Sequence, residues 1–248
     1  MNISKTQVYC KTDVGNRRPN NEDQCGFLEK KNFKVLLVAD GMGGHASGEV
    51  ASKMAKEMIL KLFNLEDSFS TPHQLKATIK KIVKKTNQII HKLSSTKEEF
   101  YGMGTTLVLA VITDFATAIV NCGDSRIYAL KDNKLQQLTR DQTVVNYLYE
   151  IHAISKEEMK TSPKRHVLMS ALGIAPSVDF DLTLIDNDYQ GLLLCSDGLT
   201  NMVEDEDIEK IWNSRFNLGP DSLCNDLIDT ALINGGIDNI AVTILEVK

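Results

Sequence analysis

Val35–His45 reads Val-Leu-Leu-Val-Ala-Asp-Gly-Met-Gly-Gly-His, and the fold is organised around this stretch. Its run of five apolar residues predicts a buried strand that ends at Asp40 and a glycine-rich bend. Residues from Gly48 onward predict a helix. A carboxylate at such a junction is held rigidly at the edge of a core. It belongs either to a dinucleotide-binding loop or to a metal site.

The dinucleotide interpretation rests on residues 41–46, which satisfy the pattern G-x-G-x-x-A between a strand and a helix. Two observations argue against it. Asp40 directly precedes the first glycine, where its charge would oppose a pyrophosphate. The predicted helix is followed by Asn64–Asp67 and a second helix, so the second strand with a ribose-binding acid about 20 residues on is missing. The residues therefore favour a metal ligand.

Acidic residues recur beside predicted strand ends along the chain. The five points are Glu22 with Asp23, then Asp40, Asp124, Asp197 and Asp238. A single aspartate at a strand end is typical of a turn or a cap. Five such points predict one cluster lined by oxygen atoms.

Composition limits the class of protein. The chain has 248 residues, of which 42% are hydrophobic and 25% charged, as in ordinary globular domains. A net charge of −5 gives no reason to expect nucleic acid binding. The five cysteines form no C-x-x-C pair, which favours buried thiols in a reducing compartment. No apolar run approaches a membrane span or a signal peptide, so we expect a cytoplasmic protein.

Hydrophobic periodicity predicts many short strands and two groups of helices. Helices are expected from Gly48 with Ser47 as a cap, after Pro72, within 144–154, from a capped start at Ser155, at Asp207–Trp212 and at Pro220–Asn234. Strands are expected at Gln7–Thr12, Cys25–Glu29, Phe33–Ala39, Thr105–Thr113, Ala116–Cys122, Ile127–Lys131, Lys134–Gln137, Phe180–Ile185, Gly191–Cys195 and Ile240–Val247. Lysines on the outside of the second helix indicate a solvated face rather than a docking patch.

The short links between consecutive strands require antiparallel pairing. Continuous apolar strands such as Leu107–Ile112 indicate sheets that are covered on both faces. We therefore predict an α+β fold, a four-layer α-β-β-α sandwich of two mainly antiparallel sheets flanked by helix pairs. Residues 1–248 would form a single domain, with an inserted flap at about 141–165.

Carboxylates without histidine or cysteine select Mg²⁺ or Mn²⁺ over zinc. Two such ions about 3.5–4 Å apart can share a water, lower its pKa to about 7 and allow in-line attack of the hydroxide on phosphorus. Arg17-Arg18, just upstream of Glu22, lies where an arginine could fork onto phosphate oxygens.

Other phosphatase designs do not fit the residues. A phosphocysteine enzyme needs an arginine six residues after the cysteine, but Cys195 has Asn201 there. A D-x-D enzyme needs a second aspartate two residues after the first, and Met42 occupies that position after Asp40. Histidine ligands are missing after Asp124. The carboxylate-only design with two ions remains.

Eight short motifs occur in order along the chain. They are Arg18–Asp23, Val38–His45, Gly102–Thr106, Gly123–Arg126, Leu138–Asp141, Ser170–Gly173, Ser196–Leu199 and Asp238-Asn239. In these motifs the chain resembles the metal-dependent serine/threonine phosphatase family (PPM, type 2C), in its compact bacterial form. The resemblance covers nearly the whole chain and implies the same sandwich fold.

The resemblance implies a set of ligands for two Mn²⁺ or Mg²⁺ ions and a third. Asp40 would bridge the two core ions. The Gly41 carbonyl and Glu22 would complete the shell of one ion, and Asp197 with Asp238 would hold the other. Asp124, with Asp197, would hold the third ion. Asp23 would orient metal-bound water from behind the ligands.

The resemblance also implies that Arg18 binds the substrate phosphate and that the flap shapes the choice of protein substrate. The expected partners are phosphorylated proteins and a eukaryote-like serine/threonine kinase that the enzyme opposes. We expect a monomer.

One departure from the family concerns the general acid. Many eukaryotic members have a histidine directly after Asp-Gly, where this chain has Met42. His45 either replaces it or packs at the helix start, and protonation by a metal-bound water is a third explanation. The other histidines are expected at the surface. The alternative function is a binding or regulatory module with an inert site, but no expected carboxylate is lost.

Overall fold

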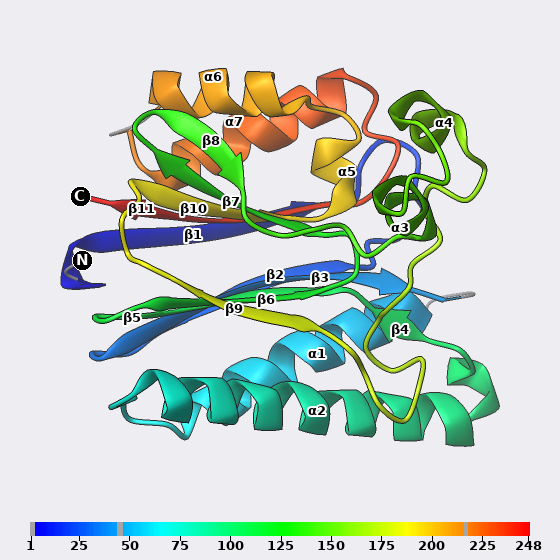
Figure 1. Cartoon of the computed structure of the whole chain (residues 1–248), viewed down its shortest axis with the longest axis horizontal. Helices are drawn as coiled ribbons and strands as arrows, with labels where there is room; N and C mark the ends of the chain where they lie inside the picture. Colours follow the sequence, from blue (N-terminus) through cyan, green and yellow to red (C-terminus); the bar gives the residue numbers. More distant parts are fainter. Residues whose placement is uncertain (1–2, 44–46, 216–217) are drawn as a thin grey trace.

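The computed structural model describes residues 3–43, 47–215 and 218–248. It confirms the predicted α+β sandwich, in which two antiparallel sheets pack face to face and helices cover both outer faces (Figure 1). Short 3₁₀ turns lie at Ile3–Lys5 (η1) and Glu98–Phe100 (η2). In the part of the chain that the structure describes, no helix is long and apolar enough to cross a bilayer.

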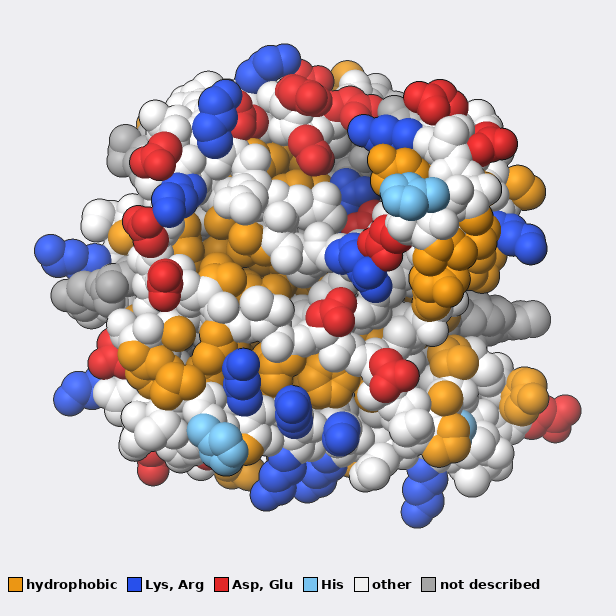
Figure 2. Space-filling view, viewed as in Figure 1, with side chains coloured by type: hydrophobic (Ala, Val, Ile, Leu, Met, Phe, Trp, Pro, Cys, Tyr) orange, Lys and Arg blue, Asp and Glu red, His pale blue; other side chains and the backbone are white. Residues whose placement is uncertain are grey.

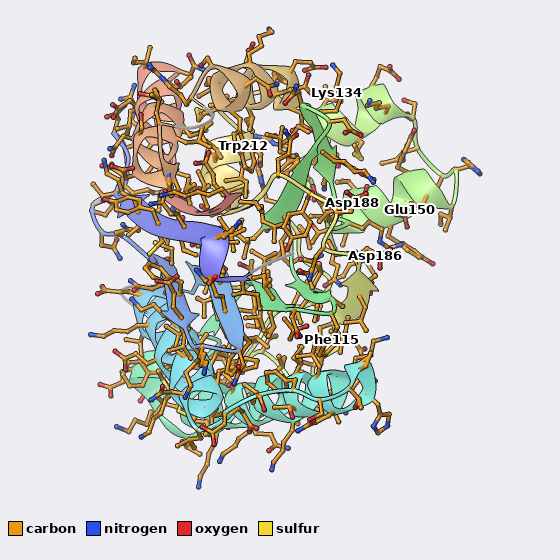
Figure 3. All side chains as sticks on the ribbon, turned by 90° about the vertical axis from the view of Figure 1, so that its left-hand side faces the viewer. Phe115, Lys134, Glu150, Asp186, Asp188 and Trp212 are labelled. Carbon is orange, nitrogen blue, oxygen red and sulfur yellow. The ribbon has the colours of Figure 1, made fainter. Side chains whose placement is uncertain are left out.

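The first sheet contains the two ends of the chain. Its order is β1 (Thr6–Asp13), β11 (Ile240–Val247), β10 (Gly191–Cys195), β7 (Arg126–Lys131) and β8 (Lys134–Gln137). Its outer face is covered by α6 (Asp205–Arg215) and α7 (Pro220–Ile233), with the short α5 (Asp197–Thr200) between β10 and α6. Trp212 of α6 is fully buried against this sheet (Figure 3).

The second sheet has the order β2 (Asp23–Glu29), β3 (Phe33–Met42), β5 (Leu107–Thr113), β6 (Thr117–Cys122) and β9 (Asp181–Ile185). The two-residue strand β4 (Gly104–Thr105) pairs with the end of β3. Every residue of β5 is buried, because helices cover one face and the first sheet covers the other.

Two long helices cover the second sheet, α1 (Ser47–Asn64) and α2 (Pro72–Thr96). The Thr71 side chain caps α2 by accepting a hydrogen bond from Gln74 N, and Pro72 occupies the first turn. The outer face of α2 is rich in lysine, as Figure 2 shows along the lower edge of the molecule; Lys80, Lys84 and Lys85 are exposed.

Side chains of β3 alternate between two cores. Val35 and Leu37 pack beneath α1 and α2, whereas Leu36 and Val38 fill the space between the sheets. Burial on both faces makes β3 the centre of the fold, as its apolar run predicts.

Strand boundaries differ from the predictions at the positions that matter for function. β3 continues past Asp40 to Met42, because β4 pairs with Gly41 and Met42. The expected strand at Thr105–Thr113 is therefore divided at Thr106. β2 begins at Asp23 and not at Cys25, and Asp23 lies opposite Asp40.

The segment expected as a flap contains two short helices, α3 (Val144–Glu150) and α4 (Lys156–Thr161). Its root is held by Arg126 of β7, whose guanidinium forks onto Asp141 at 2.9 and 2.7 Å. The Ser155 cap of α4 is confirmed, with Glu158 completing a capping box.

Candidate metal and phosphate site

A cleft of about 700 Å³ opens where the end of β3 and the start of α5 lie beside the segment that follows α4. Its lining includes most of the residues singled out from the sequence, namely Arg18, Glu22, Asp40, Gly41, Asp124, Asp197 and Asp238. These residues come from separate loops and strand ends of both sheets. The fold therefore brings together acidic points that are far apart in sequence.

Asp40 is fixed through its main chain. Its N–H donates to Thr106 Oγ1 at 3.0 Å, and its carbonyl accepts from Thr106 N at 2.8 Å and Thr105 Oγ1 at 2.9 Å. The adjacent Gly41 has no room for a side chain, because a Cβ there would lie 2.1 Å from Gly48 O. The strand end is thus held in one position while the Asp40 carboxyl faces the cleft.

Asp197 is the first residue of α5, directly after β10. Asn201, one turn later, donates to Asp197 Oδ2 at 3.0 Å. Gly198 allows α5 to lie against the backbone of Asn239, just before β11, since a Cβ at position 198 would lie 1.9 Å from Asn239 O. Asp197 and Asp238 are consequently brought to the same side of the cleft.

Asn239 joins three parts of the site. Its Oδ1 accepts from Glu22 N at 2.8 Å, and its Nδ2 donates to Val14 O at 2.8 Å and to Asn20 O at 2.9 Å. The side chain is almost fully buried. Asn239 therefore fixes the loop that carries Arg18 and Glu22 against the turn that carries Asp238.

Arg18 lies at the rim of the cleft, about half exposed, with Nη2 2.7 Å from Asp238 Oδ2. Asp23 lies behind the cleft, only 1% exposed, and accepts a 2.6 Å hydrogen bond from Ser196 Oγ. Arg18 is thus accessible from solvent, whereas Asp23 is enclosed by the protein.

Comparisons with known proteins identify the family of this chain. A family model described as protein phosphatase 2C matches residues 16–227. The chain belongs to the protein phosphatase 2C family. This phosphatase is 37% identical over 238 residues to "Serine/threonine phosphatase stp" of Listeria monocytogenes serotype 4b, covering 95% of this chain and 94% of that protein. It is 32% identical to "Protein phosphatase PhpP" of Streptococcus pneumoniae D39, covering 98% of each.

Solved structures show the same fold. The serine/threonine phosphatase of S. agalactiae superposes with a TM-score of 0.92 at 30% identity, covering 98% of this chain and 100% of that one. The Mycobacterium tuberculosis serine/threonine phosphatase PstP/Ppp superposes at 0.86 with 33% identity, covering 98% and 99%. The chain is therefore a phosphoprotein phosphatase, and its family depends on metal ions, generally Mn²⁺ or Mg²⁺.

Several carboxyl groups lie close together in and beneath the phosphatase cleft, and their pKa values are raised. Burial raises the pKa of Asp23 to about 8 and that of Asp124 to about 7, and neighbouring aspartates add to both shifts. Burial and then the charge of Asp23 raise the pKa of Asp40 well above its usual range. Burial, followed by Asp238, raises the pKa of Asp197. Such a cluster has a strong affinity for positive charge.

Within the described residues, no three acidic, histidine or cysteine side chains already surround one point as a finished ion shell. The expectation that Asp40, Asp197 and Asp238 converge on one point within ligand reach is therefore not met in the described residues, where the three line one cleft without forming a shell. Asp238 is turned toward Arg18, and its second oxygen accepts from Asn239 N at 2.9 Å.

Two histidines, His45 and His166, bear on proton transfer and on the lining of the cleft. His45, considered as general acid, lies outside the described residues. His166 follows the predicted flap and was expected only at the surface; it is exposed, yet it lines the cleft with Nδ1 3.8 Å from Asp197 Oδ2. A lone histidine in an irregular segment carries no periodic signal, so sequence reasoning missed its place. Asn239 was also missed as an organiser, although it stands next to Asp238 in a quoted motif.

Proposed function

We propose that this phosphatase hydrolyses phosphoserine and phosphothreonine monoesters in proteins with the help of two Mn²⁺ or Mg²⁺ ions and a third. The observation that carries the proposal is the shared cleft, in which buried carboxyls from both sheets lie beside one exposed arginine. Relatives along nearly the whole chain are named serine/threonine phosphatases.

The donor set fits hard divalent cations, because it consists of carboxylates and main-chain carbonyls and contains no cysteine. Asp40, Gly41 and Glu22 would hold one ion, Asp40 with Asp197 and Asp238 the other, and Asp124 with Asp197 the third. Water would complete these shells. Bound there, the ions would supply an activated water and neutralise phosphate oxygens.

The remaining steps belong to residues of the chain. Arg18 exchanges its Asp238 partner for the phosphate and holds the monoester at the rim. Asp23, fixed by Ser196, orients water from beneath. The hydrogen bonds of Thr105 and Thr106 with the Asp40 main chain keep the Asp40 carboxyl in place while negative charge develops on the phosphate oxygens. The general acid would be either His45 or a water held by the ions.

We further propose that residues 1–248 act as one catalytic domain, with the flap at about 141–165 selecting protein substrates. We expect a monomer in the cytoplasm, where free thiols such as its five cysteines persist. We propose that the enzyme reverses phosphorylation by a eukaryote-like serine/threonine kinase. Substrates of that kinase would then be the substrates of this enzyme.

Hydrolysis of a phosphothreonine peptide tests the proposal. Activity is expected with Mn²⁺ and should disappear with excess chelator. Asp40→Asn should lower kcat at least about 100-fold, because the shared ligand of two ions is lost. Asp188→Asn serves as a matched control, since Asp188 only pairs with Lys131 at the surface. Full turnover by Asp40→Asn would instead support a binding module with an inert site.

A further inference from the structure

We propose that Cys10 and Cys25 form an oxidation site, at which hydroperoxides convert the two thiols into a disulfide between the sheets. Cys10 lies in β1 and Cys25 in β2, which are edge strands of the two facing sheets. Both strands run across the middle of Figure 1. Cα atoms of β1 and β2 approach within 8 Å of each other. This bridge goes beyond the phosphatase activity and does not depend on it.

Strand pairing shows that both cysteines face the space between the sheets. Cys10 lies opposite Thr243 of β11, and Thr243 Oγ1 donates across the sandwich to Leu37 O at 3.1 Å. Cys25 lies opposite Val38 and packs with it in the core between the sheets. Directly opposed residues of an antiparallel pair point to the same face, so the two thiols point toward each other's sheet.

Two hydrogen bonds fix how β1 is aligned with β2. Near one end, Asn21 Nδ2 donates to Thr12 Oγ1 at 2.9 Å. Near the other, Lys34, which pairs with Glu29 of β2, donates from Nζ to Thr6 O at 2.9 Å. Cys10 and Cys25 both lie between these two contacts. The alignment therefore brings them to the same level along the edge.

The two thiols differ from the other cysteines in access, and Cys10 also differs in its pKa. Cys10 and Cys25 are partly exposed, whereas Cys122, Cys195 and Cys224 are buried. A hydrogen bond from Cys25 lowers the pKa of Cys10, and the Lys56 ammonium adds to this effect, which favours the nucleophilic thiolate. The hydrogen bond with Cys10, followed by burial, raises the pKa of Cys25, so Cys10 is the thiol that ionises first. Burial raises the pKa of Cys122 to about 11 and that of Cys195 to about 12.

The reaction balances with peroxide as the only oxidant. The Cys10 thiolate attacks one peroxide oxygen, the O–O bond breaks, and the Cys10 sulfenic acid and hydroxide are formed. The Cys25 sulfur then displaces the hydroxyl, forming the S–S bond and releasing water. Two thiols and one hydrogen peroxide thus give one disulfide and two waters. The sulfurs are oxidised and the peroxide is reduced.

The bridge would close the segment between residues 10 and 25, which carries Arg18, Glu22 and Asp23 of the cleft. The two ends of this segment lie in different sheets. The disulfide would therefore link the edge strands β1 and β2 covalently, on the side of the sandwich from which the Arg18–Asp23 segment runs to the cleft. A link of this kind reduces the freedom of the unfolded chain and stabilises the fold.

Peptide mass mapping tests the site. The full-length, Mg²⁺-loaded protein is treated with hydrogen peroxide, alkylated and digested. We expect one linked pair of peptides, Cys10 with Cys25, whose mass is lower by two hydrogen atoms and which dithiothreitol separates. The thermal midpoint of the oxidised protein should rise by about 5 °C. Cys25→Ser should show no rise and should leave a Cys10 sulfenic acid that dimedone traps.

Cys224→Ala is the matched control, because Cys224 lies near β1 with Sγ 3.9 Å from Tyr9 O but on α7, across the first sheet. The Cys224→Ala variant should form the same Cys10–Cys25 linked peptides as the wild type, and its thermal midpoint should rise on oxidation by the same amount. A Cys10–Cys224 bridge, a bridge only between two molecules, or no bridge while Cys10 is oxidised to sulfinic acid would each overturn the proposal.

Discussion

Arg18 Nη2 lies 2.7 Å from Asp238 Oδ2, so the arginine proposed for phosphate is paired with a carboxylate proposed for metal. Both partners are substantially exposed, and exposed ion pairs contribute little stability. The pair therefore keeps two functional groups in position more than it holds the fold together.

Arg18→Ala should raise KM for a phosphothreonine peptide about 10-fold or more, because charged hydrogen bonds to the phosphate are lost. The thermal midpoint should hardly move. Arg17→Ala is the matched control and should keep a wild-type KM. Steady-state kinetics measure KM for both variants. Equal KM values for Arg18→Ala and Arg17→Ala would contradict the role of Arg18 in phosphate binding.

Asn239→Ala should destabilise the protein by about 2–3 kcal/mol, since three partly buried hydrogen bonds to the segment at residues 14–22 are lost. The Mn²⁺ concentration for half-maximal activity should also rise, because Glu22 loses its anchor. Asn213→Ala, which removes one exposed bond to Asn133 O, is the control. Unfolding in urea and a Mn²⁺ titration measure the two effects; equal stability of the variants would exclude Asn239 as an organiser.

Stability in chelator should fall as the pH rises from about 6 to 8. The folded-state pKa of Asp124 is about 7 and that of Asp23 about 8, both above the usual 3.8 of the unfolded chain. The folded protein therefore binds protons more tightly, and this stabilisation is lost as the pH rises through those values. Urea midpoints across this range should show it, and Asp124→Asn should flatten the slope. A wild-type midpoint that increases with pH would refute the raised values.

Gly41→Ala should abolish stable folding or activity, because the new Cβ would lie 2.1 Å from Gly48 O and 2.7 Å from Glu22 O. Gly102→Ala is an informative comparison. Gly102 has a φ of +73°, but a Cβ at this position would meet no atom of the described residues within 4 Å. Only backbone strain of about 1 kcal/mol is therefore expected. Thermal unfolding of the two variants should separate a steric clash from conformational strain.

The sandwich itself was largely predictable, because burial on both faces makes strands such as Leu107–Thr113 uniformly apolar. The ends of the strands were not. Asp40 is inside β3 because β4, which contributes only two residues, extends the pairing to Met42. Propensity carries no signal for so short a strand.

The sequence by itself determined which oxygen-bearing residues stand at strand ends and, through eight ordered motifs, the family to which they belong. Only the tertiary structure decided that Arg18 meets Asp238, that Asn239 joins three segments, and that His166 reaches the cleft. The order of residues determines which segments form helices and strands, because the spacing of apolar residues along one continuous backbone sets which face of each segment is buried. Contacts between residues more than 200 positions apart depend on how the two sheets are stacked, and no local pattern encodes that.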